Sequence, residues 1–147
     1  MIRSFLINNT ENEYVPNNIL FEEWLCAIEY NKDAEITIKI VTPQEMKNLN
    51  ILYRNKDKVS DILAFPFENL SVNKKIILGD VAMCANKINK DSILFKKNKS
   101  DRWAHLIIHS TLHLLGYSHD NIKDQENMEN KEVDILEKFN ILNPYEI

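Results

Sequence analysis

Alternation of apolar and polar positions predicts the strands of this chain. Residues 34–41 read AEITIKIV, with isoleucine at every second position and polar side chains between, which is the period of a half-buried strand. Residues 1–8 carry the same pattern, and residues 60–65 and 75–83 are further short apolar runs. Gly79 lies inside the last run and predicts a bulge or a close approach of another segment. We therefore expect a small sheet of about four strands.

Apolar positions three and four residues apart predict the helices. The segment 42–45 (TPQE) forms a capping box with proline at the first helical position, and it begins a helix that runs to about Arg54. Ser100 is expected to cap a second helix over residues 101–116, which Gly116 ends. Further helices are expected over about residues 17–30, 84–90 and 121–139.

The helix over residues 101–116 is apolar on nearly all sides, so we expect it to cross the middle of the domain. Strands and helices mix along the chain without a regular strand–helix–strand alternation. This order predicts an α+β fold, with a small mixed sheet packed by helices around the central histidine-bearing helix. With 147 residues, 44% of them hydrophobic and 27% charged, the chain (residues 1–147) is expected to form a single globular domain.

Composition and charge limit the classes of function. The chain has no apolar run long enough to span a bilayer and no secretory signal pattern, so we expect a cytoplasmic protein without a membrane role. The formal net charge is -4, which gives no overall electrostatic attraction to nucleic acid. A role on nucleic acid would therefore need a local basic patch.

All 4 histidines lie within residues 105–119. His109 and His113 are four positions apart and share one helix face, and the break at Gly116 lets the chain bring His119 back under that face. Three neutral imidazoles and a water form a catalytic zinc arrangement with one open position. The alternative is a set of hydrogen-bonded core histidines, but burying several imidazoles in an apolar helix is costly unless each nitrogen has a partner. The pattern therefore favours a metal site.

Two features refine this site. The spacing of the three histidines also matches the zinc frame of metzincin peptidases, but Ser110 occupies the position of their glutamate base. Without that carboxylate the peptidase route lacks its proton acceptor. His105 lies one turn upstream, and three ligands in a row along a helix drift away from a single ion. We therefore expect His105 to support a ligand or face the substrate.

The segment 109–119 (HSTLHLLGYSH) resembles the three-histidine motif of the bacterial YbeY endoribonucleases. Segments 50–66 (NILYRNKDKVSDILAFP) and 78–81 (LGDV) resemble two further motifs of that family, in the same order. The resemblance covers most of residues 45–120. The positions that depart from the family pattern are Ser110 for glycine, Ser118 for aspartate and Ala64 for serine.

The resemblance implies a single-strand-preferring endoribonuclease that matures small-subunit rRNA ends and takes part in ribosome quality control. It implies one zinc ion per chain, bound by His109, His113 and His119. It also implies Arg54 as a catalytic residue, because a guanidinium suits the charge of a phosphate in the transition state. The implied partners are single-stranded rRNA and the ribosome or a ribosomal protein, not DNA.

Other residues are candidates for supporting roles. Lys56, Lys58 and Arg102 can form the local basic rim for RNA that the net charge does not provide. Asp61 and Asp120 are, with His105, candidates for second-sphere support of the histidines or for facing the substrate. The family pattern has an aspartate where this chain has Ser118, and Asp120 can take the place of that aspartate.

Two other functions remain open on the sequence. One is a non-enzymatic ribosome-assembly factor with a structural metal, which a fourth ligand such as His105 or Asp120 would favour. The other is a metal-dependent hydrolase on a non-RNA substrate such as a peptide, against which Ser110 counts.

Overall fold

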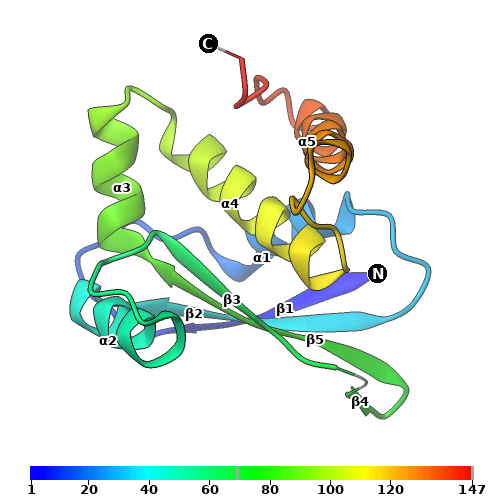
Figure 1. Ribbon diagram of the computed structural model, residues 1–147, viewed down its shortest axis with the longest axis horizontal. Coiled ribbons are helices and arrows are strands. Elements are labelled where there is room, and N and C mark those ends of the chain that lie inside the picture. The colour runs from blue at the N-terminus through cyan, green and yellow to red at the C-terminus, as the bar shows by residue number, and fades with distance from the viewer. Residues whose placement is uncertain (69, 147) are drawn as a thin grey trace.

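The computed structural model describes residues 1–68 and 70–146, and its centre is a mixed sheet (Figure 1). The strands follow the order β1-β2-β5-β3, with β4 paired to β5. Strands β1, β2 and β5 are parallel, whereas β3 and β4 run antiparallel to β5. The strands are β1 (Ile2–Asn8), β2 (Ala34–Val41), β3 (Ile62–Pro66), β4 (Ser71–Val72) and β5 (Lys75–Cys84). The α+β class is confirmed, and the two-residue β4 makes the sheet five-stranded.

Helices cover the two faces of the sheet unequally. Four helices lie on one face and α2 lies on the other (Figure 1). The helices are α1 (Asn18–Cys26), α2 (Pro43–Arg54), α3 (Ala85–Leu94), α4 (Lys99–Leu114) and α5 (Ile122–Glu137). None of the helices within residues 1–68 and 70–146 is long and apolar enough to cross a membrane.

The alternation in β2 separates two cores. Ile36 and Ile38 are fully buried against the larger helical layer, where each buried side chain contributes about 1.5–3 kcal/mol. Helix α4 crosses this layer and buries Trp103, Ile107 and Leu112 completely, so the expected central position of this helix is confirmed. On the opposite face, α2 contributes to a smaller core of Val41, Met46, Leu63, Ala82 and Cys84.

Side-chain caps explain the helix boundaries. Helix α2 begins with the predicted capping box, in which Thr42 Oγ1 accepts from the Glu45 amide and Glu45 Oε1 accepts from the Thr42 amide, both at 3.2 Å. Helix α4 begins one residue before Ser100, so the prediction of Ser100 as its cap is wrong. The side chain of Asn98 accepts from the Asp101 amide at 3.0 Å and starts the helix at Lys99.

Other boundaries differ from the expected ranges for local reasons. Helix α1 ends at Cys26, because the Ala27 amide turns to the Trp24 and Leu25 carbonyls. Pro66 is the last residue of β3 rather than the residue that stops it. Proline is tolerated there because β3 is an edge strand of the sheet.

Gly79 brings β3 and α4 close to β5. The β2–β5 register shifts between Glu35 and Ile36, which confirms the bulge. A Cβ added at Gly79 would lie 2.3 Å from the carbonyl oxygen of Phe65 and 3.0 Å from a methyl carbon of Leu114. The expected close approach is therefore confirmed as well, and it holds the C-terminal end of α4 over the edge of the sheet.

Candidate metal centre

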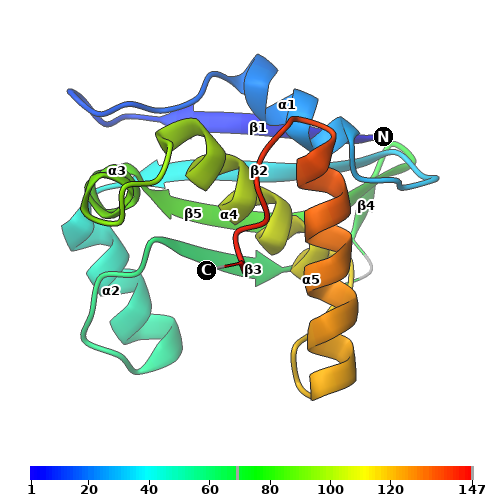
Figure 2. The ribbon, with the colours of Figure 1, turned by 90° about the horizontal axis from the view of Figure 1, so that it is seen from above.

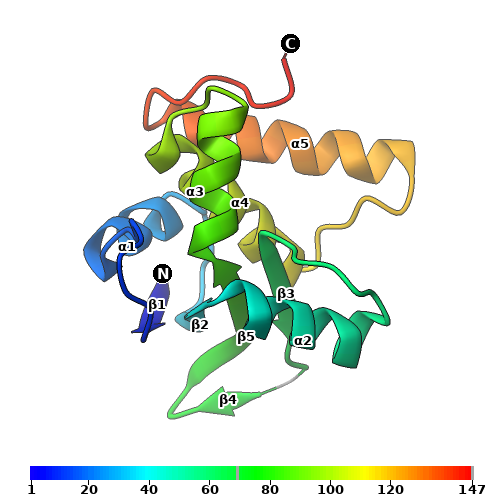
Figure 3. The ribbon, with the colours of Figure 1, turned by 90° about the vertical axis from the view of Figure 1, so that its left-hand side faces the viewer.

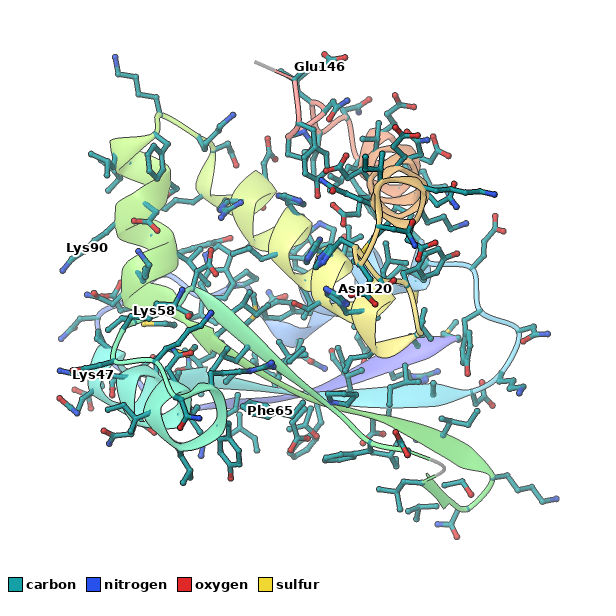
Figure 4. The ribbon with its side chains drawn as sticks, in the orientation of Figure 1. Lys47, Lys58, Phe65, Lys90, Asp120 and Glu146 are labelled. Atoms are coloured by element: carbon teal, nitrogen blue, oxygen red, sulfur yellow. The ribbon has the colours of Figure 1, made fainter. Side chains whose placement is uncertain are left out.

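Three histidines converge at the C-terminal end of α4. His109 and His113 lie on the last turns of this helix, and His119 lies on the loop that leads to α5. Their ligand atoms all lie within 4.8 Å of one another. The ring of His119 stacks on that of His109 at a centroid distance of 5.3 Å and meets the His113 ring edge-on at 4.3 Å. Figure 4 labels the neighbouring Asp120 at this end of α4.

The turn at Gly116 places His119 beside the helix. Gly116 has φ +106°, its amide donates to the His113 carbonyl, and the Tyr117 amide donates to the Leu112 carbonyl. This pair of hydrogen bonds is a Schellman motif, which ends a helix and reverses the chain. Two imidazoles therefore come from the helix register and the third from the turn.

The distances from Nε2 of His119 to the other two Nε2 atoms fit a tetrahedral metal ion. The Nε2 atom of His119 lies 2.9 Å from that of His113 and 3.4 Å from that of His109. Two imidazole nitrogens bound to one tetrahedral zinc at 2.0–2.1 Å lie about 3.3 Å apart. The two observed distances bracket this value, so the residues present fit a zinc-sized ion.

The fully buried carboxylate of Glu132, on α5, contacts His109 at Nδ1, the ring nitrogen that does not face His119. Its Oε1 atom lies 2.5 Å from Nδ1 of His109, its Oε2 atom lies 3.1 Å from Nε2 of His105, and the Tyr145 hydroxyl donates to Oε2. Burial alone would raise the pKa of Glu132, but the hydrogen bonds from His105, His109 and Tyr145 outweigh it and hold the pKa at about 2. Burial, together with Glu132 itself, raises the pKa of Tyr145 far above its ordinary value. The carboxylate is therefore ionised and the phenol protonated at neutral pH.

These contacts determine the proton positions on His105 and His109. The guanidinium of Arg102 has only donors, so Nδ1 of His105, 3.4 Å from it, accepts. Nε2 of His105 then donates to Glu132. An ionised carboxylate only accepts, so Nδ1 of His109 also donates to Glu132. The Nε2 lone pair of His109 therefore points toward the other two histidines, as metal binding requires.

Electrostatics also favour the metal-binding form of His113. Burial, followed by the neighbouring His109 and His119, lowers its pKa below the ordinary histidine value. The lowered pKa keeps the imidazole neutral at physiological pH, and only a neutral imidazole can ligate a metal.

A metal ion held by the three histidines would have only three ligands from the described residues. Within residues 1–68 and 70–146, the group that contains His109, His113 and His119 includes no fourth His, Cys, Asp or Glu. Both ring nitrogens of His105 are engaged elsewhere, with Arg102 and Glu132. Three protein ligands and an open position are typical of catalytic rather than structural zinc sites.

The sequence-predicted supporting aspartates lie in different surroundings. Asp61 pairs with Arg102 at 3.0 Å, so it reaches His105 through the guanidinium. Asp120 is exposed on the loop after His119. Ser118 donates to Asp124 of α5 at 3.3 Å, which ties the His119 loop to that helix. The carboxylate that contacts a triad histidine is Glu132.

Arg54 contacts the edge strand β3, and two of the three predicted basic residues lie on the loop between α2 and β3. The Arg54 guanidinium, exposed at the end of α2, donates to the Ala64 carbonyl of β3 at 3.3 Å. Lys56 and Lys58 are exposed on the following loop, and Figure 4 labels Lys58. Figures 2 and 3 show the C-terminal end of α2 and the N-terminal end of α5 projecting past β3 on the same side. Arg102 is instead held between Asp61 and His105.

The sequence did not predict two residues of this hydrogen-bond network, Glu132 and Tyr145. A signal for Glu132 was present, because Met128, Glu132, Ile135 and Leu136 share the buried face of α5. A charged residue on an otherwise apolar helix stripe is buried only when it has partners, and histidines were the available partners. Tyr145 gave no periodic signal, because it lies beyond the last helix.

A family model and individual proteins both match this chain over most of its length. The family model described as "Endoribonuclease YbeY" matches residues 7–140. Proteins named "Endoribonuclease YbeY" from Buchnera aphidicola subspecies Schizaphis graminum and Cinara cedri are 44% and 41% identical to this chain. The alignments cover 93% and 92% of this chain and 87% and 88% of those proteins, respectively. The solution structure of a Thermotoga maritima protein matches over 100% of both chains with a TM-score of 0.60 and 20% identity, a likeness of fold.

Proposed function

The chain belongs to the endoribonuclease YbeY family, and from this premise we propose that it is a zinc-dependent endoribonuclease that hydrolyses phosphodiester bonds in single-stranded rRNA. We further propose that it acts in the cytoplasm on the ends of small-subunit rRNA and in ribosome quality control, in contact with the ribosome or a ribosomal protein. RNA rather than DNA is the proposed substrate.

The observation that carries this proposal is the histidine triad, which groups three ligands and no fourth among residues 1–68 and 70–146. His109, His113 and His119 would hold one zinc ion per chain. A zinc ion bound there supplies Lewis acidity at a phosphoryl oxygen and lowers the pKa of a water molecule to near neutrality. Glu132 supports the proposal because it fixes the His109 tautomer that a metal needs.

Arg54 is proposed to stabilise the negative charge that develops on the scissile phosphate. A guanidinium has five donors, and the hydrogen bond to Ala64 uses one of its nitrogens. The remaining donors match the oxygens of a phosphate in a bidentate arrangement. The edge of β3 would then lie between Arg54 and the metal, with the RNA strand running across it.

Lys56 and Lys58 are proposed to bind neighbouring phosphates, because both are exposed on the loop directly after Arg54. For Arg102 we propose a different main role. It contacts Asp61 and His105, so it is proposed to hold His105 in place against Glu132, the residue that contacts His109. Asp61 supports the site through Arg102, and Asp120, which borders His119, is proposed to face the substrate.

A non-enzymatic assembly factor with a structural metal is the main competing function. A structural zinc site has four protein ligands and no open position. Both ring nitrogens of His105 already have partners, so His105 is a poor fourth ligand. The open position therefore supports the enzyme. A peptidase remains disfavoured, because Ser110 is buried and carries no carboxylate.

Cleavage of a labelled single-stranded RNA by the purified protein tests the proposal. The RNA is incubated with the protein as isolated, after chelation, and after zinc is returned, and Arg54→Ala serves as the control for contaminating nuclease. We expect cleavage that chelation abolishes and zinc restores, and cleavage about 100–1,000-fold slower with Arg54→Ala. Cleavage that persists in the chelated protein would contradict metal dependence. Zinc bound at one per chain without cleavage, also on ribosomal substrate, would favour the assembly factor.

A further inference from the structure

The chain after α5 returns to the histidines. Residues 138–146 turn back across α4 (Figure 2), and two contacts fix their path. The Ile141 amide donates to the Leu136 carbonyl at 3.1 Å, and the Ile141 side chain is buried. Farther along, the side chain of Asn143 accepts from the Tyr145 amide at 2.8 Å. The proline between these two residues restricts the backbone of this turn.

Tyr145 faces inward at the end of this turn. Although 38% of the residue is exposed, its ring packs edge-on against His105 at a centroid distance of 5.4 Å. Its hydroxyl donates to Oε2 of Glu132. The terminal segment thus delivers one hydrogen-bond donor to the carboxylate that supports His109.

The contacts of Glu132 connect the Tyr145 hydroxyl to the metal centre. Oε2 takes hydrogen bonds from His105 and Tyr145, and Oε1 takes one from His109. The carboxylate is fully buried, so bulk water does not replace a missing donor, and an unsatisfied buried acceptor is costly. Without the Tyr145 hydroxyl, the carboxylate is free to rotate toward its remaining donors and to loosen its bond to His109.

We propose that the C-terminal segment is a working part of the metal centre, with Tyr145 as a positioning residue that locks Glu132 and through it orients His109 for metal binding. This inference rests on the proposed function, because it takes the histidine triad as the zinc site. It assigns to the terminal segment a role in metal affinity that the three ligands alone do not reveal.

Metal affinity of the full-length protein tests the inference without any RNA. Zn²⁺ dissociation constants are measured by competition with a chelator for the wild type, for Tyr145→Phe and for the control Tyr14→Phe. The first substitution removes the hydroxyl and keeps the ring against His105. The control removes a hydroxyl from a tyrosine that packs on Trp103, away from the histidines. Loss of an outer partner of a metal ligand weakens binding about 10–100-fold, and we expect about tenfold for Tyr145→Phe and no change for Tyr14→Phe.

A spectroscopic measurement separates positioning from a merely structural role. The visible absorption bands of bound Co²⁺ report the geometry of the ligands, so Tyr145→Phe should change their position or intensity while Tyr14→Phe leaves them unchanged. A chain ending at Leu142, which retains the buried Ile141, should weaken zinc binding at least as much as Tyr145→Phe.

The outcomes distinguish this inference from the proposed function. If the wild type binds Zn²⁺ and Tyr145→Phe binds it with the same dissociation constant and Co²⁺ spectrum, the inference is overturned and the enzyme proposal stands. If the wild type binds neither ion, both are overturned.

Discussion

At the level of single residues, the candidate site depends on which nitrogen of each imidazole carries the proton. Glu132 accepts from Nδ1 of His109, so in the neutral imidazole the lone pair lies on Nε2, which faces His119. The lowered pKa of His113 keeps that ring neutral. The tautomer of His109 is therefore set by a residue outside the triad, whereas the neutral state of His113 is set by burial and by the two other histidines.

Substitution of His113 should remove one of the three proposed zinc ligands. The Nε2 atom of His113 lies 2.9 Å from that of His119, and two imidazoles hold zinc far less tightly than three. We expect His113→Ala to weaken Zn²⁺ binding by more than the roughly 100-fold upper range for outer partners, and to abolish RNA cleavage. Chelator competition and the cleavage assay measure the two effects. Retention of wild-type affinity would remove His113 from the ligand set.

Arg54 should separate catalysis from metal binding. Its hydrogen bond to the Ala64 carbonyl is solvent-exposed, so Arg54→Ala should cost under about 1 kcal/mol of stability and leave Zn²⁺ affinity unchanged. Loss of a donor that stabilises transition-state charge typically lowers kcat by about 100–1,000-fold, which we expect here. Arg3→Ala, an exposed arginine on β1, is the matched control. Normal cleavage by Arg54→Ala would show that its assigned role is wrong.

The sequence predicted the three converging histidines and named His105 as a supporting residue, but it did not predict Glu132. His109, His113 and His119 lie within one helix and the turn that follows it, where local spacing determines which side chains meet. Glu132 is 23 positions from His109, and the pairing depends on how α5 packs on α4. No local periodicity encodes that packing.

At the level of elements, both glycines have a positive φ, and only Gly79 is also crowded by neighbouring atoms. Gly116 needs its positive φ, since an added Cβ would meet nothing within 4 Å. Gly79 needs the missing side chain, since the same atom would lie 2.3 Å from the Phe65 carbonyl oxygen. Substitution by alanine should therefore affect the site at the first position and the sheet at the second.

Gly116→Ala should disturb the turn that presents His119. An L-residue in a left-handed conformation costs about 1–2 kcal/mol, and relaxation of the turn would move His119 away from His113. Because 1.4 kcal/mol corresponds to tenfold in a binding constant, we expect about tenfold weaker Zn²⁺ binding by chelator competition. Asn tolerates positive φ better than Ala, so Gly116→Asn should lose less. Equal affinity in all three proteins would exclude the turn as a determinant.

Gly79→Ala should weaken the pairing of β3 with β5. The added methyl group forces the Phe65 carbonyl and the Leu114 side chain apart, and overpacking of this kind costs about 1–3 kcal/mol. We expect a lower urea midpoint together with faster amide exchange in β3. A midpoint equal to that of the wild type would show that the sheet absorbs the methyl group.

Element boundaries were predictable where a side chain fixes them. The capping box at Thr42 and Glu45 gave the start of α2, and the helix ends at Arg54 as expected. The start of α4 was misassigned because Asn98 and Ser100 are both good caps in sequence. Only the fold decides which of them faces the free amides.

At the level of the whole molecule, the sheet order could not be derived from the pattern of apolar residues. Strand β3 precedes β5 in sequence but lies outside it, so β5 occupies the centre of the sheet between β2 and β3. That order places β3 under the end of α4 and beside α2. The proposed site would therefore combine the locally formed histidine triad with α2 and β3, which only tertiary packing brings to the end of α4.

Metal binding should stabilise the entire fold, because the proposed site joins α4, the His119 loop and, through Glu132, α5 and the terminal segment. A ligand that binds only the folded state at 100 times its dissociation constant adds about 2.7 kcal/mol. For a chain of 147 residues this corresponds to a rise in Tm of about 5–10 °C. We expect this rise when Zn²⁺ is added to chelated wild type in a thermal melt. His113→Ala is the control and should show little or no rise, whereas an equal rise in both proteins would mean that zinc stabilises the fold from another site.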